Sequence, residues 1–340
     1  MGFSIRQFEA KAGERTGPAF ELADTAGTVR AEVWPMAGFN CLRWQVRQPD
    51  GSWGSILFTM PDWETNPVPT RSGHPILFPF PGRLREGKLP ANGKTYQLPL
   101  NDSTKQHAIH GFTPRNAWRV GGLSTSGESA SITGLFELEN ELPAALGSWP
   151  ASFALSVTYR LFADRLAVEA SVANRGSEPL PFGLGYHPYF RLPGTTDADV
   201  GGHVLHANVK QVWEADANNL PTGFKLDLPP VLDFRLPRPI GNTALDHVFT
   251  GVTRSSISGL VEMATLSHPQ ATGRLGIWAD ADFRELVLFT PAHRQSVAIE
   301  PYTCSADASN LASRGVDSGW LTLSPGQTWT ARVEYRWEKS

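Results

Sequence analysis

The stretch FALSVTYRLFADRLAVEASVA, residues 153–173, decides the fold class. Its first nine residues alternate between apolar and polar side chains, and the apolar face holds Phe153, Leu155, Val157, Tyr159 and Leu161. The alternation resumes further along the stretch, with the apolar face formed by Leu166, Val168, Ala170 and Val172. Because successive side chains of a strand point to opposite faces, each half predicts a half-buried strand. The short Ala163-Asp164-Arg165 segment between the halves predicts a β-hairpin.

Two further stretches follow the same rule. Residues 329–337 alternate after a Ser324-Pro325-Gly326 turn, and LGIWADADFRELVLFT, residues 275–290, predicts another hairpin. A helix is expected only in NELPAAL, residues 140–146, and for no more than one or two turns. The 27 prolines and 32 glycines punctuate the chain as turns between short strands do. We therefore predict an all-β fold, a large antiparallel β-sandwich of two sheets packed face to face.

The composition of the 340 residues is that of a globular protein, with 41% hydrophobic and 19% charged side chains. A formal net charge of −3 gives no electrostatic footprint for nucleic acid, and no run of about 18 apolar residues predicts a membrane span. Cys41 and Cys304 do not make a disulfide framework, and the N-terminal segment lacks the apolar region of a signal peptide. We expect one domain over residues 1–340, located in the cytoplasm, as a monomer or homodimer.

Ionisable side chains with unusual neighbours occur in five segments. His187 lies in PFGLGYHPYFRLP, and Glu300 ends a strand-like run in SVAIEPY. The other segments are HPILFPFPGRLREGKL with Arg83, KQHAIHGF with His107 and His110, and ALDHVF with Asp246. Each also has a purely structural explanation, such as a packed histidine, a surface ion pair or a carboxylate at a strand edge or turn.

The pair His107 and His110 does not predict a metal site. Positions three apart on a strand face opposite sides, and no cysteine or third histidine lies close in the sequence. The chain also lacks a Gly-rich phosphate loop, a dinucleotide fingerprint and a G-x-S-x-G nucleophile motif. We therefore expect no metal site, no nucleotide cofactor and no serine hydrolase chemistry.

Taken in this order, the segments resemble the aldose 1-epimerase (galactose mutarotase-like) family. The similarity runs from about residue 25 to the C-terminus, and five motifs carry it: HPILFPFPGRL, AIHGF, GYHPYF, LDHVF and AIEPYTC. The resemblance implies the family's large antiparallel β-sandwich, or supersandwich. It also implies an enzyme that interconverts the α and β anomers of a free monosaccharide without a cofactor.

The resemblance assigns roles residue by residue. His187 is implied as the general acid and Glu300 as the general base. Sugar hydroxyls are expected to bind Arg83, His110 and Asp246.

Gly82 departs from the family pattern, which commonly has asparagine directly before the arginine. A sugar-facing amide is therefore expected to be missing, which leaves the preferred hexose open. Apolar sugar faces pack on aromatic rings, and the candidate platforms are Trp278, Phe249 and Tyr189, with core packing as the alternative for each.

Anomer exchange needs an acid and a base on different sides of one acetal carbon. Opening the ring removes a proton from the C1 hydroxyl and delivers one to the ring oxygen, tasks that suit a carboxylate and an imidazolium. Burial is expected to raise the pKa of Glu300, and a nearby carboxylate, with Asp246 as one candidate, is expected to keep His187 protonated.

Three other functions fit the same pattern. A hexose-6-phosphate 1-epimerase would need an extra cationic pocket, for which the candidates are Arg71, Arg85 and Lys105, although such residues are often solvated surface charges. A non-catalytic sugar-binding module of the same fold would bind sugars without accelerating anomer exchange. A lyase or hydrolase on a related sandwich would release reducing ends from an oligosaccharide.

Overall fold

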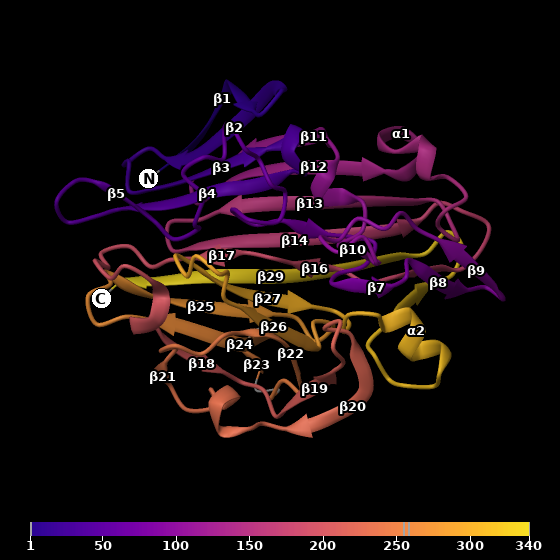
Figure 1. Ribbon diagram of the computed structural model, residues 1–340. Coiled ribbons are helices and arrows are strands. Elements are labelled where there is room, and N and C mark those ends of the chain that lie inside the picture. Colours follow the sequence, from indigo (N-terminus) through magenta and orange to yellow (C-terminus); the bar gives the residue numbers. More distant parts are fainter. Residues whose placement is uncertain (1, 254–255, 258, 340) are drawn as a thin grey trace.

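Two large antiparallel sheets dominate the computed structural model, which describes residues 2–253, 256–257 and 259–339 (Figure 1). The first sheet has ten strands, in the order β11-β12-β13-β14-β29-β25-β24-β18-β21, with β23 beside β24. Their bounds are β11 (Arg119–Thr125), β12 (Ala130–Glu137), β13 (Phe153–Leu161), β14 (Arg165–Asn174), β29 (Thr328–Lys339), β25 (Gly273–Ala279), β24 (Leu260–Ser267), β18 (Val204–Ala207), β21 (Arg238–Pro239) and β23 (Ser256–Ile257).

The second sheet has eight strands, in the order β20-β19-β22-β26-β27-β16-β6, with β17 beside β27. Their bounds are β20 (Pro221–Asp227), β19 (Gln211–Ala215), β22 (Asp246–Thr250), β26 (Glu285–Phe289), β27 (Val297–Tyr302), β16 (Gly185–Tyr186), β6 (Ile76–Leu77) and β17 (Tyr189–Phe190). These two antiparallel sheets confirm the predicted all-β sandwich.

The N-terminal part of the chain forms a five-stranded sheet whose first two strands contact β11 and β12. Its strands are β1 (Phe3–Ala12), β2 (Arg15–Asp24), β3 (Val29–Trp34), β4 (Asn40–Arg47) and β5 (Trp53–Ser55). Three two-stranded ladders complete the strands: β7 (Arg83–Arg85) with β10 (His107–Ile109), β8 (Lys88–Ala91) with β9 (Lys94–Gln97), and β15 (Leu180–Phe182) with β28 (Leu321–Leu323).

Helices are short throughout the described residues. The α-helices are α1 (Leu138–Glu141) and α2 (Ala308–Ser313), and the 3₁₀ turns are η1 (Pro35–Ala37), η2 (Thr113–Arg115), η3 (Pro143–Ala145), η4 (Val200–Gly202) and η5 (Pro230–Leu232). The turn or two expected near NELPAAL is confirmed by α1 and η3. Within the described part of the chain, no helix has the length and apolar character needed to cross a membrane.

The hairpin predicted over residues 153–173 is confirmed. Strands β13 and β14 pair from Leu161 opposite Leu166, and β13 alternates between buried and half-buried residues along its whole length. The buried face of β13 points to the core, as the apolar alternation predicted.

The hairpin predicted over residues 275–290 is wrong, although both strands exist. Strand β25 pairs with β24 and β29 in the ten-stranded sheet, whereas β26 pairs with β22 and β27 in the eight-stranded sheet. Both edges of each strand are therefore occupied by other partners. The segment between them carries the chain from one sheet to the other, which side-chain alternation does not reveal.

Aromatic side chains join the two large sheets. The ring of Phe78, just after β6, meets Phe153 of β13 edge to face at 4.8 Å between centroids. His74 lies fully buried in the same interface, with Nδ1 2.9 Å from the Tyr159 hydroxyl and Nε2 2.8 Å from the Tyr335 hydroxyl. This histidine is fully hydrogen-bonded by the core.

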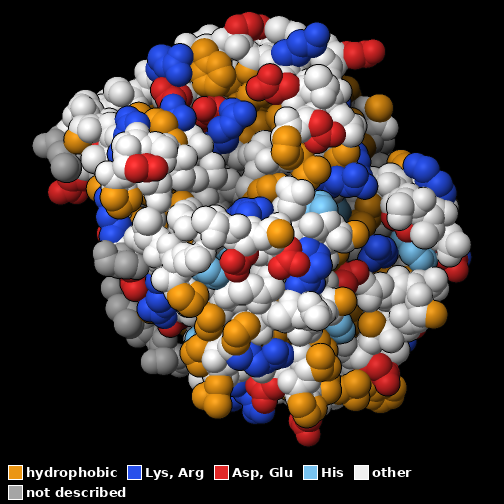
Figure 2. Space-filling view, turned by 60° about the vertical axis from the view of Figure 1, so that its left-hand side comes forward, with side chains coloured by type: hydrophobic (Ala, Val, Ile, Leu, Met, Phe, Trp, Pro, Cys, Tyr) orange, Lys and Arg blue, Asp and Glu red, His pale blue; other side chains and the backbone are white. Residues whose placement is uncertain are grey.

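Large apolar side chains are exposed near one end of the molecule. Figure 2 shows hydrophobic side chains gathered at the bottom of the view, the end at which β20 lies in Figure 1. On the edge strand β20, Phe224 is 70% exposed, and Leu236 nearby in the sequence is 79% exposed. The acidic and basic side chains in Figure 2 are interspersed over this face.

Candidate active site

A cavity of about 670 Å³ opens on the outer face of the eight-stranded sheet. Along β26, Leu286 and Leu288 face the core between the sheets, whereas Val287 and Phe289 line the cavity. The period-two alternation of strands thus gives the sheet one core face and one cavity face. Among the residues that line the cavity are Arg83, His110, His187, Tyr189, Asp246 and Glu300, all singled out in the sequence.

His187 lies between the short strands β16 and β17. Its backbone N–H donates to the carbonyl of Pro75 at 2.9 Å, and its ring stacks on Tyr189 at 4.7 Å between centroids. Its Nε2 lies 3.4 Å from Oε1 of Glu300, and its buried Nδ1 has no hydrogen-bond partner among the described residues. Burial lowers the pKa of His187 to about 3, so the ring is neutral near pH 7.

The neutral state of His187 corrects the expectation that a nearby carboxylate keeps this histidine protonated. The carboxyl group beside His187 belongs to Glu300 and not to Asp246, and burial of the ring favours the neutral imidazole over the expected imidazolium. In this buried position, desolvation of the imidazolium has the largest influence on the pKa of His187.

Glu300 is almost completely buried on β27, with 1% of its surface exposed. The Tyr302 hydroxyl donates to its Oε2 at 2.7 Å, which leaves Oε1 directed at His187. Burial raises the pKa of Glu300 well above its ordinary value, and the hydrogen bond from Tyr302 opposes part of that rise. The expected rise in this pKa therefore agrees with the environment of the carboxyl group.

His187 and Glu300 form one proton-sharing pair. Burial disfavours both the imidazolium and the carboxylate, so it favours a neutral imidazole beside a protonated carboxyl group. Transfer of the proton from Glu300 to His187 creates both charges side by side, where their attraction offsets part of the desolvation cost. The pair can therefore accept and donate protons without a change in its total charge.

His110 and Arg83 reach the cavity from the β7–β10 ladder, in which Arg83 pairs with Ile109. Nδ1 of His110 accepts the Gly82 backbone N–H at 3.2 Å, so the neutral ring carries its proton on Nε2. The His110 ring meets the His187 ring edge to face at 5.6 Å between centroids. Burial keeps the pKa of His110 well below its ordinary value.

Asp246 begins β22 on the cavity wall. The side-chain amide of Asn219 donates to its Oδ2 at 2.6 Å. Desolvation raises the pKa of Asp246, and the positive charge of Arg83 opposes the rise. Asn219 itself lines the cavity, but its turn belongs to no motif, so no signal in the sequence pointed to this residue.

The backbone geometry and close packing at position 82 explain why this chain has glycine where the family commonly has asparagine. Its φ is +66°, and a Cβ there would lie only 2.8 Å from Cβ of Ala306. Any side chain at position 82 would therefore be both strained and crowded. Asn219 supplies a cavity amide from a different part of the chain.

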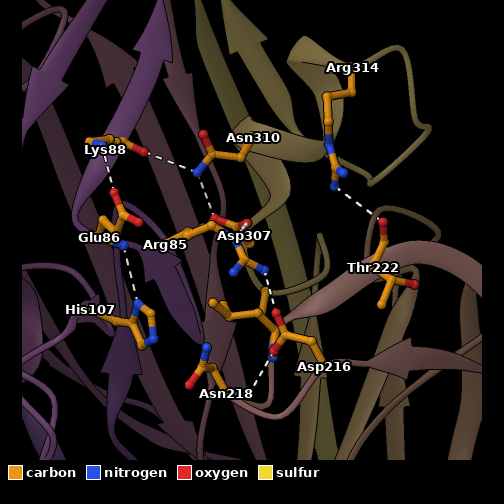
Figure 3. A network of polar contacts seen from close by, with 12 residues as sticks. Arg85, Glu86, Lys88, His107, Asp216, Asn218, Thr222, Asp307, Asn310 and Arg314 are labelled. Atoms are coloured by element: carbon orange, nitrogen blue, oxygen red, sulfur yellow. Dashed lines mark hydrogen bonds and ion pairs between the residues drawn. The ribbon is translucent and has the colours of Figure 1, made fainter.

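A polar network ties the ladder and helix beside the cavity to the turn that holds Asn219 (Figure 3). Arg85 donates to Asp216 at 2.8 Å, and its Nε lies 3.5 Å from Asp307. Asp216 in turn accepts the backbone N–H groups of Asn218 at 2.8 Å and Leu220 at 3.1 Å. The contacts of Arg85 with Asp216 and Asp307 thus hold these segments together.

Two of the proposed aromatic platforms lie elsewhere. Trp278 is on β25 of the other large sheet, with the Arg336 guanidinium 4.4 Å from its ring centroid. Phe249 is fully buried in the core, because Val248 beside it takes the cavity face of β22. Tyr189 does line the cavity.

The cavity includes groups that the motifs did not single out. Trp213 lines it, and its indole N–H donates to the buried Glu285 at 3.0 Å. Arg115, at the end of η2, and Tyr302 also line it, and so does Arg71, whereas Lys105 is not among the lining residues. Sequence signals for these residues were weak, because only Tyr302 lies within a recognised motif.

The fold is a large antiparallel β-sandwich with a cavity on the outer face of its eight-stranded sheet. The family model for aldose 1-epimerase matches residues 40–336, and the chain belongs to the aldose 1-epimerase family.

Individual relatives agree with this assignment. The chain is 29% identical to the uncharacterised Escherichia coli (strain K12) protein YihR over 236 residues, which cover 69% of this chain and 71% of YihR. Its fold matches a galactose mutarotase-like protein from Clostridium acetobutylicum with a TM-score of 0.85, at 22% identity over 100% of this chain and 99% of the other. It also matches galactose 1-epimerase from Lactobacillus acidophilus NCFM with a TM-score of 0.75, at 19% identity over 99% of both chains.

Proposed function

We propose that the protein is a mutarotase, which interconverts the α and β anomers of a free aldose. The observation that carries the proposal is the approach of His187 Nε2 to within 3.4 Å of Glu300 Oε1 on the wall of one cavity. The C1 hydroxyl and the ring oxygen are bonded to the same carbon. The two groups lie side by side and not on the different sides of that carbon that were expected from the sequence, but adjacent proton-transfer groups can serve both oxygens.

Ring opening uses the charged form of the pair. The Glu300 carboxylate takes the proton of the C1 hydroxyl, the C1–ring oxygen bond breaks, and the imidazolium of His187 protonates the ring oxygen. The products are the open aldehyde, a protonated Glu300 and a neutral His187. Burial favours this neutral form of the pair, so it assists the opening step.

Ring closure reverses the proton transfers after rotation about the C1–C2 bond. Neutral His187 takes the proton of the C5 hydroxyl, the oxygen attacks the other face of the aldehyde, and Glu300 protonates the carbonyl oxygen. Protons and charges balance over the cycle. Each of the two groups is expected to contribute about 10²–10⁴ in rate.

Three further side chains are positioned to bind sugar hydroxyls. Arg83 and Nε2–H of His110 offer donors, and Asp246 offers an acceptor, all on the wall of the cavity. Directional groups of this kind fix a polar ligand in one orientation. Tyr302 donates to Oε2 of Glu300, so that Oε1 of Glu300 faces His187.

Anomer exchange itself tests the proposal. Freshly dissolved α-D-glucose and α-D-galactose would be followed by polarimetry or NMR with and without the protein. Acceleration that disappears in the Glu300→Gln variant is the expected result. Sugar binding without acceleration would instead identify a non-catalytic binding module, and release of reducing ends from oligosaccharides would identify a lyase or hydrolase.

We also propose that the chain forms one domain, because a single hydrophobic core includes residues from Phe20 to Trp337. The cytoplasmic location and the monomer or homodimer state stay predictions. Sedimentation of the purified protein would decide the second.

A further inference from the structure

Three arginines line the cavity: Arg71, Arg83 and Arg115. Among the residues that the structure describes, none of their side chains forms a hydrogen bond or an ion pair. Arg85, on the same strand as Arg83, shows the contrast, because it is held by Asp216 and Asp307 (Figure 3). The cavity therefore contains three guanidinium groups that no ion pair among the described residues engages.

Arg115 is the most informative of these arginines. Its Nη1 is buried without a hydrogen-bond partner in the described part of the chain. A buried donor of a charged group that lacks a partner costs free energy, and a bound anion would remove that cost. Arg115 lies close enough to His110 for its charge to contribute to lowering the pKa of that ring.

The carboxylates that line the cavity are bound to other groups, and within the described residues none forms an ion pair with these arginines. Oδ1 of Asp102 accepts the backbone N–H groups of Gln106 and His107, and its Oδ2 accepts the Thr104 hydroxyl. Asp246 binds Asn219, and burial favours the protonated form of Glu300.

Arg71 adds positive charge at an exposed part of the cavity wall. Its side chain is solvent-accessible, and its charge contributes to lowering the pKa of His293, which also lines the cavity. A neutral sugar presents hydroxyls that need a mixture of donors and acceptors. Arg71 and Arg115 supply more donors than a neutral sugar requires. They suit an oxyanion, which accepts hydrogen bonds from several N–H groups at once.

We propose that the substrate is an aldose that carries an acidic group, a carboxylate, sulfonate or phosphate, and that Arg115 binds this group while Arg71 strengthens the positive field at the cavity mouth. This inference rests on the proposed mutarotase activity. It places the cationic site at arginines other than the Arg85 and Lys105 suggested by the sequence.

The experiment compares anomer exchange by NMR at constant ionic strength. The substrates are glucose, galactose, glucuronate, glucose 6-phosphate and a glucose 6-sulfonate analogue, so that the three acid groups are distinguished. We expect kcat/KM for at least one acidic aldose to exceed that for glucose by about 10-fold or more, as one charge-assisted contact would give.

Variants connect this preference to Arg115. Arg115→Gln should lower the ratio of kcat/KM for the preferred acidic aldose over glucose by about 10-fold or more, and Arg115→Lys should restore part of it. Arg175→Gln is the control, because Arg175 is exposed and does not line the cavity. Circular dichroism checks that each variant is folded.

Two results would overturn the inference and leave the mutarotase proposal standing: glucose or galactose exchanging at least as efficiently as every acidic aldose, or an unchanged ratio in folded Arg115→Gln. A lack of acceleration with every sugar would instead overturn the mutarotase proposal and this inference with it.

Discussion

His74 and His187 are two buried histidines, each followed by proline, that the fold uses in opposite ways. Burial lowers the pKa of both to about 3. Both ring nitrogens of His74 are bound by the hydroxyls of Tyr159 and Tyr335. Nδ1 of His187 instead has no hydrogen-bond partner in the part of the chain that the structure describes, and its Nε2 lies 3.4 Å from Glu300 Oε1 and 3.4 Å from the Tyr189 hydroxyl at a cavity.

The difference shows what separates a structural histidine from a candidate acid. Burial, motif and pKa shift are alike at the two positions. What differs is the number of satisfied ring nitrogens and access to a ligand-sized cavity. An unsatisfied buried polar group that also borders a ligand-sized cavity is therefore the better indicator of chemistry.

The largest effect is expected at Glu300. Glu300→Gln should reduce the catalysed rate of anomer exchange by at least ~10², because the amide cannot accept the proton. The folded-state pKa of Glu300 is raised, so its contribution to stability is lost as pH rises above the unfolded value. The variant should therefore unfold at a higher temperature than wild type at pH 8, as calorimetry would measure.

Glu285→Gln is the matched control, since Glu285 is also buried and its pKa is raised to about 7. It should give stabilisation in the same direction and a much smaller change in rate. A near-wild-type rate in Glu300→Gln would remove Glu300 from the mechanism.

The two histidines can be compared directly by the same substitution. His187→Asn should cut the rate by at least ~10². His74→Asn should leave the rate per folded molecule near wild type but lower the free energy of unfolding by about 1–3 kcal/mol, because buried hydroxyls lose their partner. Polarimetry and urea unfolding give the two quantities. If His74→Asn lost activity as strongly as His187→Asn, the functional contrast between the two positions would be wrong.

Arg83→Ala should chiefly weaken binding. Loss of one charge-assisted contact to a sugar hydroxyl is expected to raise KM by about 10-fold, with a smaller effect on kcat. Steady-state rates over a range of sugar concentrations separate the two parameters, with Arg175→Ala as the exposed control. An unchanged KM would exclude Arg83 from substrate binding.

The smallest effect concerns pH. His187 takes up a second proton only near its lowered pKa of about 3, so the rate should stay within about 2-fold as pH falls from 7 to 5. The buried histidines should lower stability over the same interval, because unfolded histidine binds protons below about 6.5 and the buried rings do not, whereas the raised pKa values of Glu300 and Glu285 act in the opposite direction. A loss of rate centred near pH 6.5 would show that His187 titrates as an exposed histidine does.

Local patterns predicted the strands well and their partners less well. The residues 153–173 hairpin followed from alternation and a short turn, both of which are local. Strands β25 and β26 were also recognised, but alternation does not say which sheet a strand joins.

The candidate site was likewise only partly predictable from local sequence patterns. Motif residues such as Glu300 and His187 line one cavity. Asn219 and Arg115 line it as well, but they lie in turns that belong to no motif. Phe249 could have been excluded from the sequence, because it lies three positions from Asp246 and so faces the opposite side of the strand.

The close approach of Gly82 to Ala306 constrains which residues can replace this glycine. An asparagine cannot be introduced at position 82 alone, because its Cβ meets the methyl group of residue 306. Redesign toward the commoner family pattern is therefore a coupled substitution, Ala306→Gly together with Gly82→Asn, in which neither single change is informative by itself.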